Sequence, residues 1–196
     1  PAAGAFETMS LRIIAGQWRG RKLQVPQGET TRPTADRTRE TLFSMLVSRL
    51  GTFEGLSVAD LFAGSGALGL EALSRGAASC IFVEQDAAAI RALRTNIGHL
   101  KAEAQSDVRA SSVLTLPIAK APLDLILLDP PYGSGAGAVA LERLGRLGWI
   151  GPATWISLET HADEEPNVKS LEAVVDRKVG KARLTLLRAP FDFGPA

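Results

Sequence analysis

The feature that most constrains the fold is an alternation of short apolar runs with longer helix-type segments through the middle of the chain. Residues 56–62, 79–84, 107–111, 123–129 and 154–160 each have the length and composition of a strand. Helix-type segments lie between several of them, at 64–76, 86–102 and 137–149. Parallel strands need long crossovers, usually helices, so this order predicts an α/β domain with a doubly wound sheet.

The two ends of the chain depart from this alternation. Residues 11–26, "LRIIAGQWRGRKLQVP", contain two β-prone runs around a glycine- and arginine-rich centre and predict a hairpin. A helix is predicted next, capped by Thr34 or Asp36. The apolar face of this helix would hold Leu42, Phe43, Leu46, Val47 and Leu50. Residues 173–189 split at Gly180 into two strands joined by a tight turn, which predicts an antiparallel element at the late edge of the sheet.

Composition and charge narrow the class of protein. No apolar run approaches the roughly 20 residues that a membrane helix needs. The single Cys80 gives no disulfide and the two histidines have no companions, so we expect no metal and a reducing, cytoplasmic setting. Residues 9–49 carry eight Lys or Arg against three Asp or Glu. Such an excess indicates either a face that meets a polyanion or a solvated basic face.

In doubly wound sheets, ligands bind beyond the carboxyl ends of the strands. The segments expected at that edge are 60–66, 84–86, 111–113, 129–132 and 159–161. The first contains a glycine-rich turn, "DLFAGSGALGLEA", in which Gly64, Gly66 and Gly69 fit the spacing G-x-G-x-x-G. Glu84 ends the next strand, where an acid can accept hydrogen bonds from ribose hydroxyls. The pattern favours a nucleoside cofactor, and a tight turn without a ligand is the alternative.

Asp60 helps to separate the possible cofactors. It lies inside the strand, four residues before the first glycine. A carboxylate there would repel the diphosphate of NAD at the helix N-terminus, whereas the cationic amino-acid end of S-adenosylmethionine (SAM) would be attracted, directly or through water. The alternative role for Asp60 is to cap the turn that follows it.

The stretch "LILLDPPYG", residues 125–133, ends another strand at the same edge. The carboxylate of Asp129 and the carbonyl of Pro130 can each accept one N–H of an exocyclic amine on a nucleobase. These hydrogen bonds would aim the nitrogen lone pair at a methyl donor, while Tyr132 offers a face for the base to stack on. The alternative is a strand end without chemistry, since proline stops strands.

With these motifs the chain resembles a known family. "DLFAGSGALGLEALSRGA" and "DPPY" are similar to SAM-dependent amino-methyltransferases. "RIIAGQWRGRKL" and "RPTADRTRETLFSML" narrow the resemblance to bacterial 16S rRNA guanine-N2 methyltransferases of the RsmD type, from about Leu11 to about Arg188. The resemblance implies methylation of guanine 966 at N2 with SAM. It also implies a Rossmann-like class I methyltransferase sheet of seven strands, the last pair antiparallel, behind a small N-terminal β-hairpin extension.

The resemblance also assigns residues. The catalytic tetrapeptide is Asp129, Pro130, Pro131 and Tyr132. The cofactor site is Asp60, Phe62, Gly64, Ser65, Gly66, Glu84, Gln85 and Asp86, with Thr34 in a loop, 32–34, that closes over cofactor and target. The family commonly has an Asp after the third strand, near the adenine ring, where this chain reads "RASSVLTL". Ser111, Ser112 and Val113, or their backbone N–H groups, are expected to act there instead.

The basic residues near the N-terminus then have an expected partner in RNA phosphate. They are Arg12, Arg19, Arg21, Lys22, Arg32, Arg37 and Arg39. Trp18 lies among them and is expected to pack in the core rather than to stack on a base. The expected substrate is 16S rRNA, naked or within a partly or fully assembled small ribosomal subunit, and the expected protein is a monomer.

This interpretation divides the chain into three parts. Residues 1–8 are interpreted as a remnant ahead of a natural start at Met9, 9–50 as the basic hairpin and helix, and 51–196 as the SAM-binding methyltransferase domain. Other functions stay open on the sequence alone. One is an amino-methyltransferase acting on adenine or cytosine of DNA or another RNA, and more distant ones are an NAD-dependent oxidoreductase and a non-catalytic RNA-binding protein.

Overall fold

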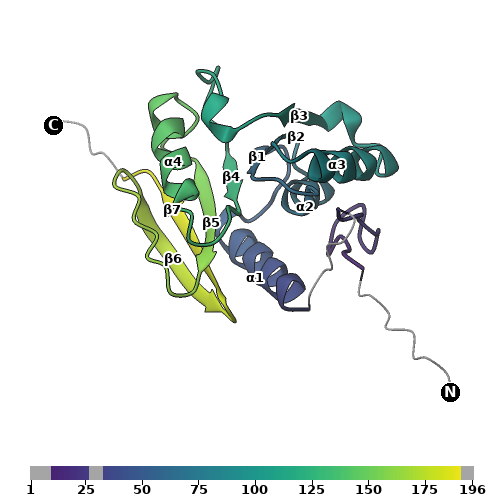
Figure 1. Ribbon diagram of the computed structural model, residues 1–196, viewed down its shortest axis with the longest axis horizontal. Helices are drawn as coiled ribbons and strands as arrows, with labels where there is room; N and C mark the ends of the chain where they lie inside the picture. Colours follow the sequence, from purple (N-terminus) through teal and green to yellow (C-terminus); the bar gives the residue numbers. More distant parts are fainter. Residues whose placement is uncertain (1–9, 27–32, 191–196) are drawn as a thin grey trace.

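A seven-stranded sheet forms the centre of the protein (Figure 1). The structure is a computed structural model that describes residues 10–26 and 33–190. Its strands are β1 Ser57–Leu61, β2 Ser79–Glu84, β3 Ser106–Ala110, β4 Leu125–Leu128, β5 Trp155–His161, β6 Glu172–Val179 and β7 Ala182–Arg188. Their order is β3-β2-β1-β4-β5-β7-β6, parallel from β3 to β5 and antiparallel in both pairs that contain β7. The predicted α/β sheet with its late antiparallel pair is confirmed.

Helices cover both faces of this sheet. They are α1 Pro33–Leu50, α2 Ala67–Ser74, α3 Ala87–His99 and α4 Ala136–Arg146, with the short 3-10 turns η1 Glu103–Gln105 and η2 Val113–Thr115. One hydrophobic core joins α1, α2, α3 and the N-terminal segment to one face, and a second joins α4 and η2 to the other. No helix of the described ranges is long and apolar enough to cross a membrane. Because every βα connection returns to the sheet, the carboxyl ends of the parallel strands share one edge.

Helix α1 differs from the prediction at its start and along its apolar face. It begins at Pro33, a favoured first position because the ring presets φ and needs no N–H donor, so Asp36 lies inside the helix. Leu42, Phe43 and Leu46 are buried, as expected. Val47 is 39% exposed, which corrects the prediction, and Met45 is buried on the core side. Hydrophobic spacing alone did not show which of Met45 and Val47 faces the core.

Residues 11–26 form a hairpin with a minimal ladder. A single antiparallel bridge joins Arg12 to Lys22, and backbone hydrogen bonds from Leu23 to Leu11 and from Ile13 to Arg21 flank it. The predicted hairpin is therefore present, but its two runs are not strands. Figure 1 shows this segment beside α2 and α3, at the opposite side of the molecule from β6.

Polar side chains of α2 give the hairpin its shape. The backbone N–H groups of Ile14 and Ala15 donate to the carboxylate of Glu71, at 2.8 and 3.1 Å, and Glu71 is fully buried. The Ser74 hydroxyl accepts from the N–H of Trp18 at 3.0 Å. Gly16 has φ of +89°, and any side chain there would overlap the Ser74 carbonyl. Trp18 is 9% exposed and belongs to the core, which confirms the packing role expected for it.

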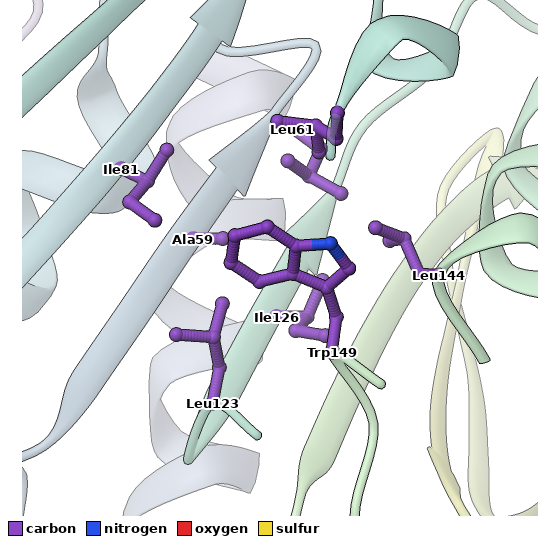
Figure 2. A pocket seen from close by; sticks show the side chains of 8 residues that line it. Ala59, Leu61, Ile81, Leu123, Ile126, Leu144 and Trp149 are labelled. Atoms are coloured by element: carbon purple, nitrogen blue, oxygen red, sulfur yellow. The ribbon is translucent and has the colours of Figure 1, made fainter. Parts of the chain in front are cut away.

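The opposite face of the sheet is closed by Trp149, which follows α4 (Figure 2). Its indole ring lies among apolar side chains of the sheet and α4, including Ala59, Ile126 and Leu144, and its Nε1 donates to the carbonyl of Pro117 at 2.8 Å. The space left beside the ring is about 10 Å³. Because that volume is at the lower limit for one water and the lining is apolar, it is a packing gap of the core.

Candidate active site

A cleft of about 570 Å³ lies at the edge of the sheet where the parallel strands end. Its lining is Phe62, Val83, Glu84, Gln85, Asp86, Ser111, Ser112, Val113, Asp129, Pro130, Pro131, Tyr132 and Glu159. These residues end or follow the five strands β1 to β5. The structure therefore brings the predicted tetrapeptide and most of the predicted cofactor residues into one cleft.

Glu84 connects the cleft to the glycine-rich turn. Its Oε1 accepts from the N–H of Gly64 at 2.8 Å, and its Oε2 accepts from the N–H groups of Gln85 and Asp86 at 2.8 and 2.9 Å. The carboxylate is thus fixed at the end of β2. Phe62 lies two residues before Gly64 and has φ of 60°. This left-handed conformation costs a bulky residue roughly 1–3 kcal/mol. Such strain is typical of binding sites, and Phe62 lines the cleft.

The glycines of the turn set the backbone conformation and the packing of α2, and they do not line the cleft. Gly64 and Gly66 have left-handed φ values of +57° and +89°, and Gly66 is the N-cap of α2. Gly69 lies where any side chain would overlap the ring of Phe82, so it lets α2 approach β2 closely. Gly64, Ser65 and Gly66 lie outside the cleft lining given above. Their role toward a cofactor stays a prediction.

Asp60 is buried beneath the turn, with 1% of its surface exposed. Its Oδ2 accepts a hydrogen bond from the N–H of Gly69 at 2.9 Å, which is the capping role weighed as the alternative. Burial raises the pKa of Asp60 to about 8, the hydrogen bond from Gly69 opposes this rise, and the charge of Glu84 adds to it. Asp60 does not line the cleft, so a contact with a cofactor also stays a prediction.

Two further residues predicted for the cofactor site hold local structure as well. Asp86 is the N-cap of α3 and accepts from the N–H of Ala89 at 2.9 Å. Ser112 is the N-cap of η2 and accepts from the N–H of Leu114 at 3.2 Å. Both line the cleft beside Ser111. These caps fix the backbone that would face an adenine ring, in place of the acid that the family commonly has there.

Asp129 follows β4 and lines the cleft, where part of its surface is open to solvent while the surrounding protein desolvates its carboxyl group. The protein around the cleft raises the pKa of Asp129 well above its ordinary value: burial has the largest effect, and the charge of Glu159, a hydrogen bond with Glu159 and the charge of Asp60 add to it. Pro130 is buried. In the described part of the chain no group donates to its carbonyl oxygen. Both residues line the cleft, and their role as a pair of acceptors for an amine stays a prediction.

Tyr132 is held from two sides. Its hydroxyl donates to Oε2 of Glu159 at 2.7 Å, and its ring meets the ring of His161 edge to face, with centroids 5.6 Å apart. Burial and the negative charge of Glu159 raise the pKa of the phenol. The next residue, Gly133, donates its N–H to Glu164 at 2.7 Å. With 47% of its surface exposed, Tyr132 still presents area to an incoming base.

Glu159 is the acidic residue of the cleft lining to which the sequence assigned no role. The sequence predicted that residues 159–161 lie at the ligand edge. The only sign of this was the position of Glu159 near the end of a predicted strand, now β5. In the sheet Leu158 lies beside Leu128, so Glu159 follows directly beside Asp129. Only the register of β4 against β5 reveals that two acids meet there.

The predicted RNA-contacting residues do not form one uniform group. Arg12, Arg19, Arg21, Lys22 and Arg37 are exposed. Arg39 is 7% exposed and donates to the carbonyl of Arg12 at 2.7 Å, while burial lowers its pKa. This corrects the prediction for Arg39, because a buried guanidinium that holds the hairpin to α1 is not available to phosphate. Arg32 and the side chain of Thr34 lie outside the described residues.

Comparison with known proteins identifies the family of the chain. A family model described as "Conserved hypothetical protein 95" matches residues 11–188. The chain is 40% identical over 153 residues to "Ribosomal RNA small subunit methyltransferase D" of Escherichia coli, covering 78% of this chain and 76% of that protein. The Haemophilus influenzae protein of the same name is 40% identical over 158 residues, covering 79% and 80%.

A solved structure agrees in fold over nearly the whole length. It is the yhhF protein of Escherichia coli, a provisionally assigned methyltransferase, with a TM-score of 0.79 and 35% identity over 92% of this chain and 98% of that one. The family model, over residues 11–188, includes the hairpin, the sheet and the cleft residues. The chain therefore belongs to the "Conserved hypothetical protein 95" family, that of ribosomal RNA small subunit methyltransferase D.

Proposed function

We propose that the protein transfers a methyl group from SAM to N2 of guanine 966 of 16S rRNA in the small ribosomal subunit. Family membership supports methylation of rRNA. The observation that carries the chemistry is that Glu84, Asp129 and Pro130 line one cleft, where Glu84 could hold a ribose and the other two could accept from an amine. The base and its position rest on the resemblance described above.

The charge of the cleft fits SAM better than a dinucleotide. Its lining contains the four acids Glu84, Asp86, Asp129 and Glu159, and no lysine or arginine among the described residues. A diphosphate would meet these carboxylates without a compensating cation. SAM carries an ammonium, a sulfonium and a ribose, so the acids favour it. Glu84 would hold the ribose, and the segment 111–113 would lie along the adenine. The oxidoreductase alternative is accordingly not favoured.

The residues of the tetrapeptide would position the amine and accept its proton. Bound SAM supplies a methyl group on a positively charged sulfur. Asp129 and the carbonyl of Pro130 each accept one N–H of the amine, which turns its lone pair toward the methyl carbon. Tyr132 stacks on the base. Once the nitrogen is methylated it must release a proton, and a carboxylate with the raised pKa of Asp129 is suited to accept it.

The target guanine must leave its stack to reach Asp129 at the floor of the cleft. The exposed basic residues of the hairpin and α1 would contact the surrounding phosphates, which positions the RNA without selecting a sequence. We place this activity in the cytoplasm, where small subunits are assembled, and propose a monomer as the acting species.

The direct test is methyl transfer from SAM to small subunits that lack the modification, with protein-free 16S rRNA assayed in parallel. We expect one methyl group at N2 of guanine 966, mapped by nuclease digestion and mass spectrometry. Asp129→Ala should reduce the rate by roughly 10²-fold or more while binding SAM nearly as tightly as the wild type. A methyl group on adenine or cytosine would instead establish the alternative amino-methyltransferase. Comparing the rates on small subunits and on protein-free 16S rRNA shows which of the two is the substrate.

A further inference from the structure

Two acids meet at the floor of the cleft, and the mechanism above uses only one of them. Asp129 follows β4 and Glu159 lies in β5, side by side through the register that pairs Leu128 with Leu158. Both line the cleft. Within residues 10–26 and 33–190 no group of three or more His, Cys, Asp or Glu could hold a metal ion, so the pair is not part of such a cluster.

The surroundings of Glu159 leave it an acceptor. The Tyr132 hydroxyl donates to its Oε2 at 2.7 Å, so Glu159 already acts as a hydrogen-bond acceptor in the cleft. Burial first, and then the charge of Glu159 and a hydrogen bond with it, raise the pKa of Asp129, which shows that the two carboxyl groups interact. The two carboxyl groups line the same cleft on neighbouring strands, so they offer two neighbouring acceptors to a base.

The bases that carry an exocyclic amine differ at the ring nitrogen beside it. In guanine this nitrogen, N1, carries a hydrogen and donates, in the same direction as the amine. In adenine and cytosine the corresponding ring nitrogen has a lone pair and accepts. A carboxylate beside the amine site would therefore attract guanine and repel the other two, because an acceptor that the bound base shields from water is left unpaired when it faces a lone pair.

We propose that Glu159 selects guanine by accepting the N1–H of the target base while Asp129 and the carbonyl of Pro130 hold its amine. This inference rests on the methyl transfer proposed above. The tetrapeptide alone cannot choose the base, since guanine, adenine and cytosine each offer an amine to Asp129. In this proposal Glu159 makes that choice. Tyr132, whose hydroxyl donates to Glu159, would orient the carboxylate and stack on the base it reads.

The test replaces the target guanine with 2-aminopurine in reconstituted small subunits. This base keeps the amine but has a lone pair at N1. We expect the wild type to prefer guanine by on the order of 10²-fold in kcat/KM. In Glu159→Gln the side-chain amide can turn to donate to N1, so the preference should fall to within about tenfold. Competition binding of the two kinds of subunit gives a readout that does not depend on methyl transfer, and it should show the same loss of preference.

Glu165→Gln is the matched control, the same change on an exposed acid that faces Arg183 at 3.4 Å. It should keep the wild-type preference. If Glu159→Gln slows both substrates by one factor and leaves the preference intact, Glu159 only supports Tyr132 and the inference is overturned. If the folded wild type binds SAM but does not methylate guanine-bearing subunits at all, the proposed function itself fails, which is a different result.

Discussion

The side-chain amide of Asn96 donates a hydrogen bond to the carbonyl oxygen of Ser65, 3.0 Å away. The same nitrogen donates to the carbonyl of Gln24 at 2.9 Å, and Oδ1 of Asn96 accepts from the N–H of Gln24 at 2.7 Å. Asn96 is 1% exposed. One buried amide in α3 therefore joins the end of the hairpin to the glycine-rich turn, so the proposed RNA-binding segment and the proposed cofactor turn share a support.

We expect Asn96→Ala to destabilise the protein by about 3 kcal/mol, roughly 1 kcal/mol for each of its three hydrogen bonds. SAM affinity should also fall, because the turn at Ser65 loses its anchor. Urea denaturation and calorimetry measure the two effects. Asn167→Ala makes the same change at an exposed loop position and should leave both unchanged. A loss of stability below about 0.5 kcal/mol at position 96 would contradict the role of the amide.

Gly69 and Gly145 offer a matched pair of helix glycines. A methyl group at Gly69 would overlap the ring of Phe82 and lie 2.7 Å from the sulfur of Cys80, so Gly69→Ala should cost about 1–3 kcal/mol. Gly145 lies in α4 with open space around it, so Gly145→Ala should stabilise the protein by about 0.5–1 kcal/mol. Thermal unfolding of both variants checks the opposite signs. Equal effects would show that close packing of α2 on β2 is not what requires glycine.

Asp60 should make stability depend on pH. Its pKa is about 8 in the folded state, against about 3.9 for an ordinary Asp, so between these values the folded protein binds the proton that the unfolded chain releases. The contribution is complete below about pH 4 and is lost as the pH rises to about 8. Relative to Asp60→Asn, wild-type stability should fall by at most about 1.4 kcal/mol per pH unit in that window and then level off. Urea midpoints from pH 5 to pH 9 measure the difference, and parallel curves for the two proteins would refute it.

The basic face of the hairpin should matter for RNA and not for the cofactor. Arg19→Glu combined with Arg21→Glu should weaken RNA binding about tenfold or more and flatten its dependence on salt, with SAM affinity unchanged. Lys178→Glu combined with Lys181→Glu gives the same charge change at the β6–β7 turn, at the far edge of the sheet, and serves as control. Filter binding across a salt series measures both variants. Wild-type binding that is insensitive to salt would contradict the phosphate contacts.

The sequence predicted the elements well where local pattern decides them. The bounds of β2, Ser79–Glu84, agree with the expected strand, and the turn at Gly180 lies between β6 and β7 as expected. These segments carry their own signals, an unbroken apolar run in one case and a glycine between β-prone runs in the other. The tetrapeptide at 129–132 also lies in the cleft, because a residue that follows a parallel strand must reach the ligand edge.

Arg39 is the basic residue that the sequence misjudged, although helical spacing from Leu42 and Phe43 already places it on the buried side of α1. Two other residues have contacts that only tertiary structure reveals. The role of Glu159 required the register of β5 against β4. Asp60 is both buried and close to the cleft, and a strand-internal acid gives no local sign of which of its neighbours it will bond.

Arg12 and Lys22 share the only bridge of the described hairpin, so the segment has almost no ladder of its own. Four of its backbone donors, those of Ile14, Ala15, Trp18 and Gln24, bond instead to side chains of Glu71 and Ser74 in α2 and of Asn96 in α3. The extension is therefore not a portable module. If it were grafted onto another Rossmann-like domain, it would lose its shape unless that domain also carried the equivalents of Glu71, Ser74 and Asn96. The basic surface and the two helices beneath it must therefore change together in evolution.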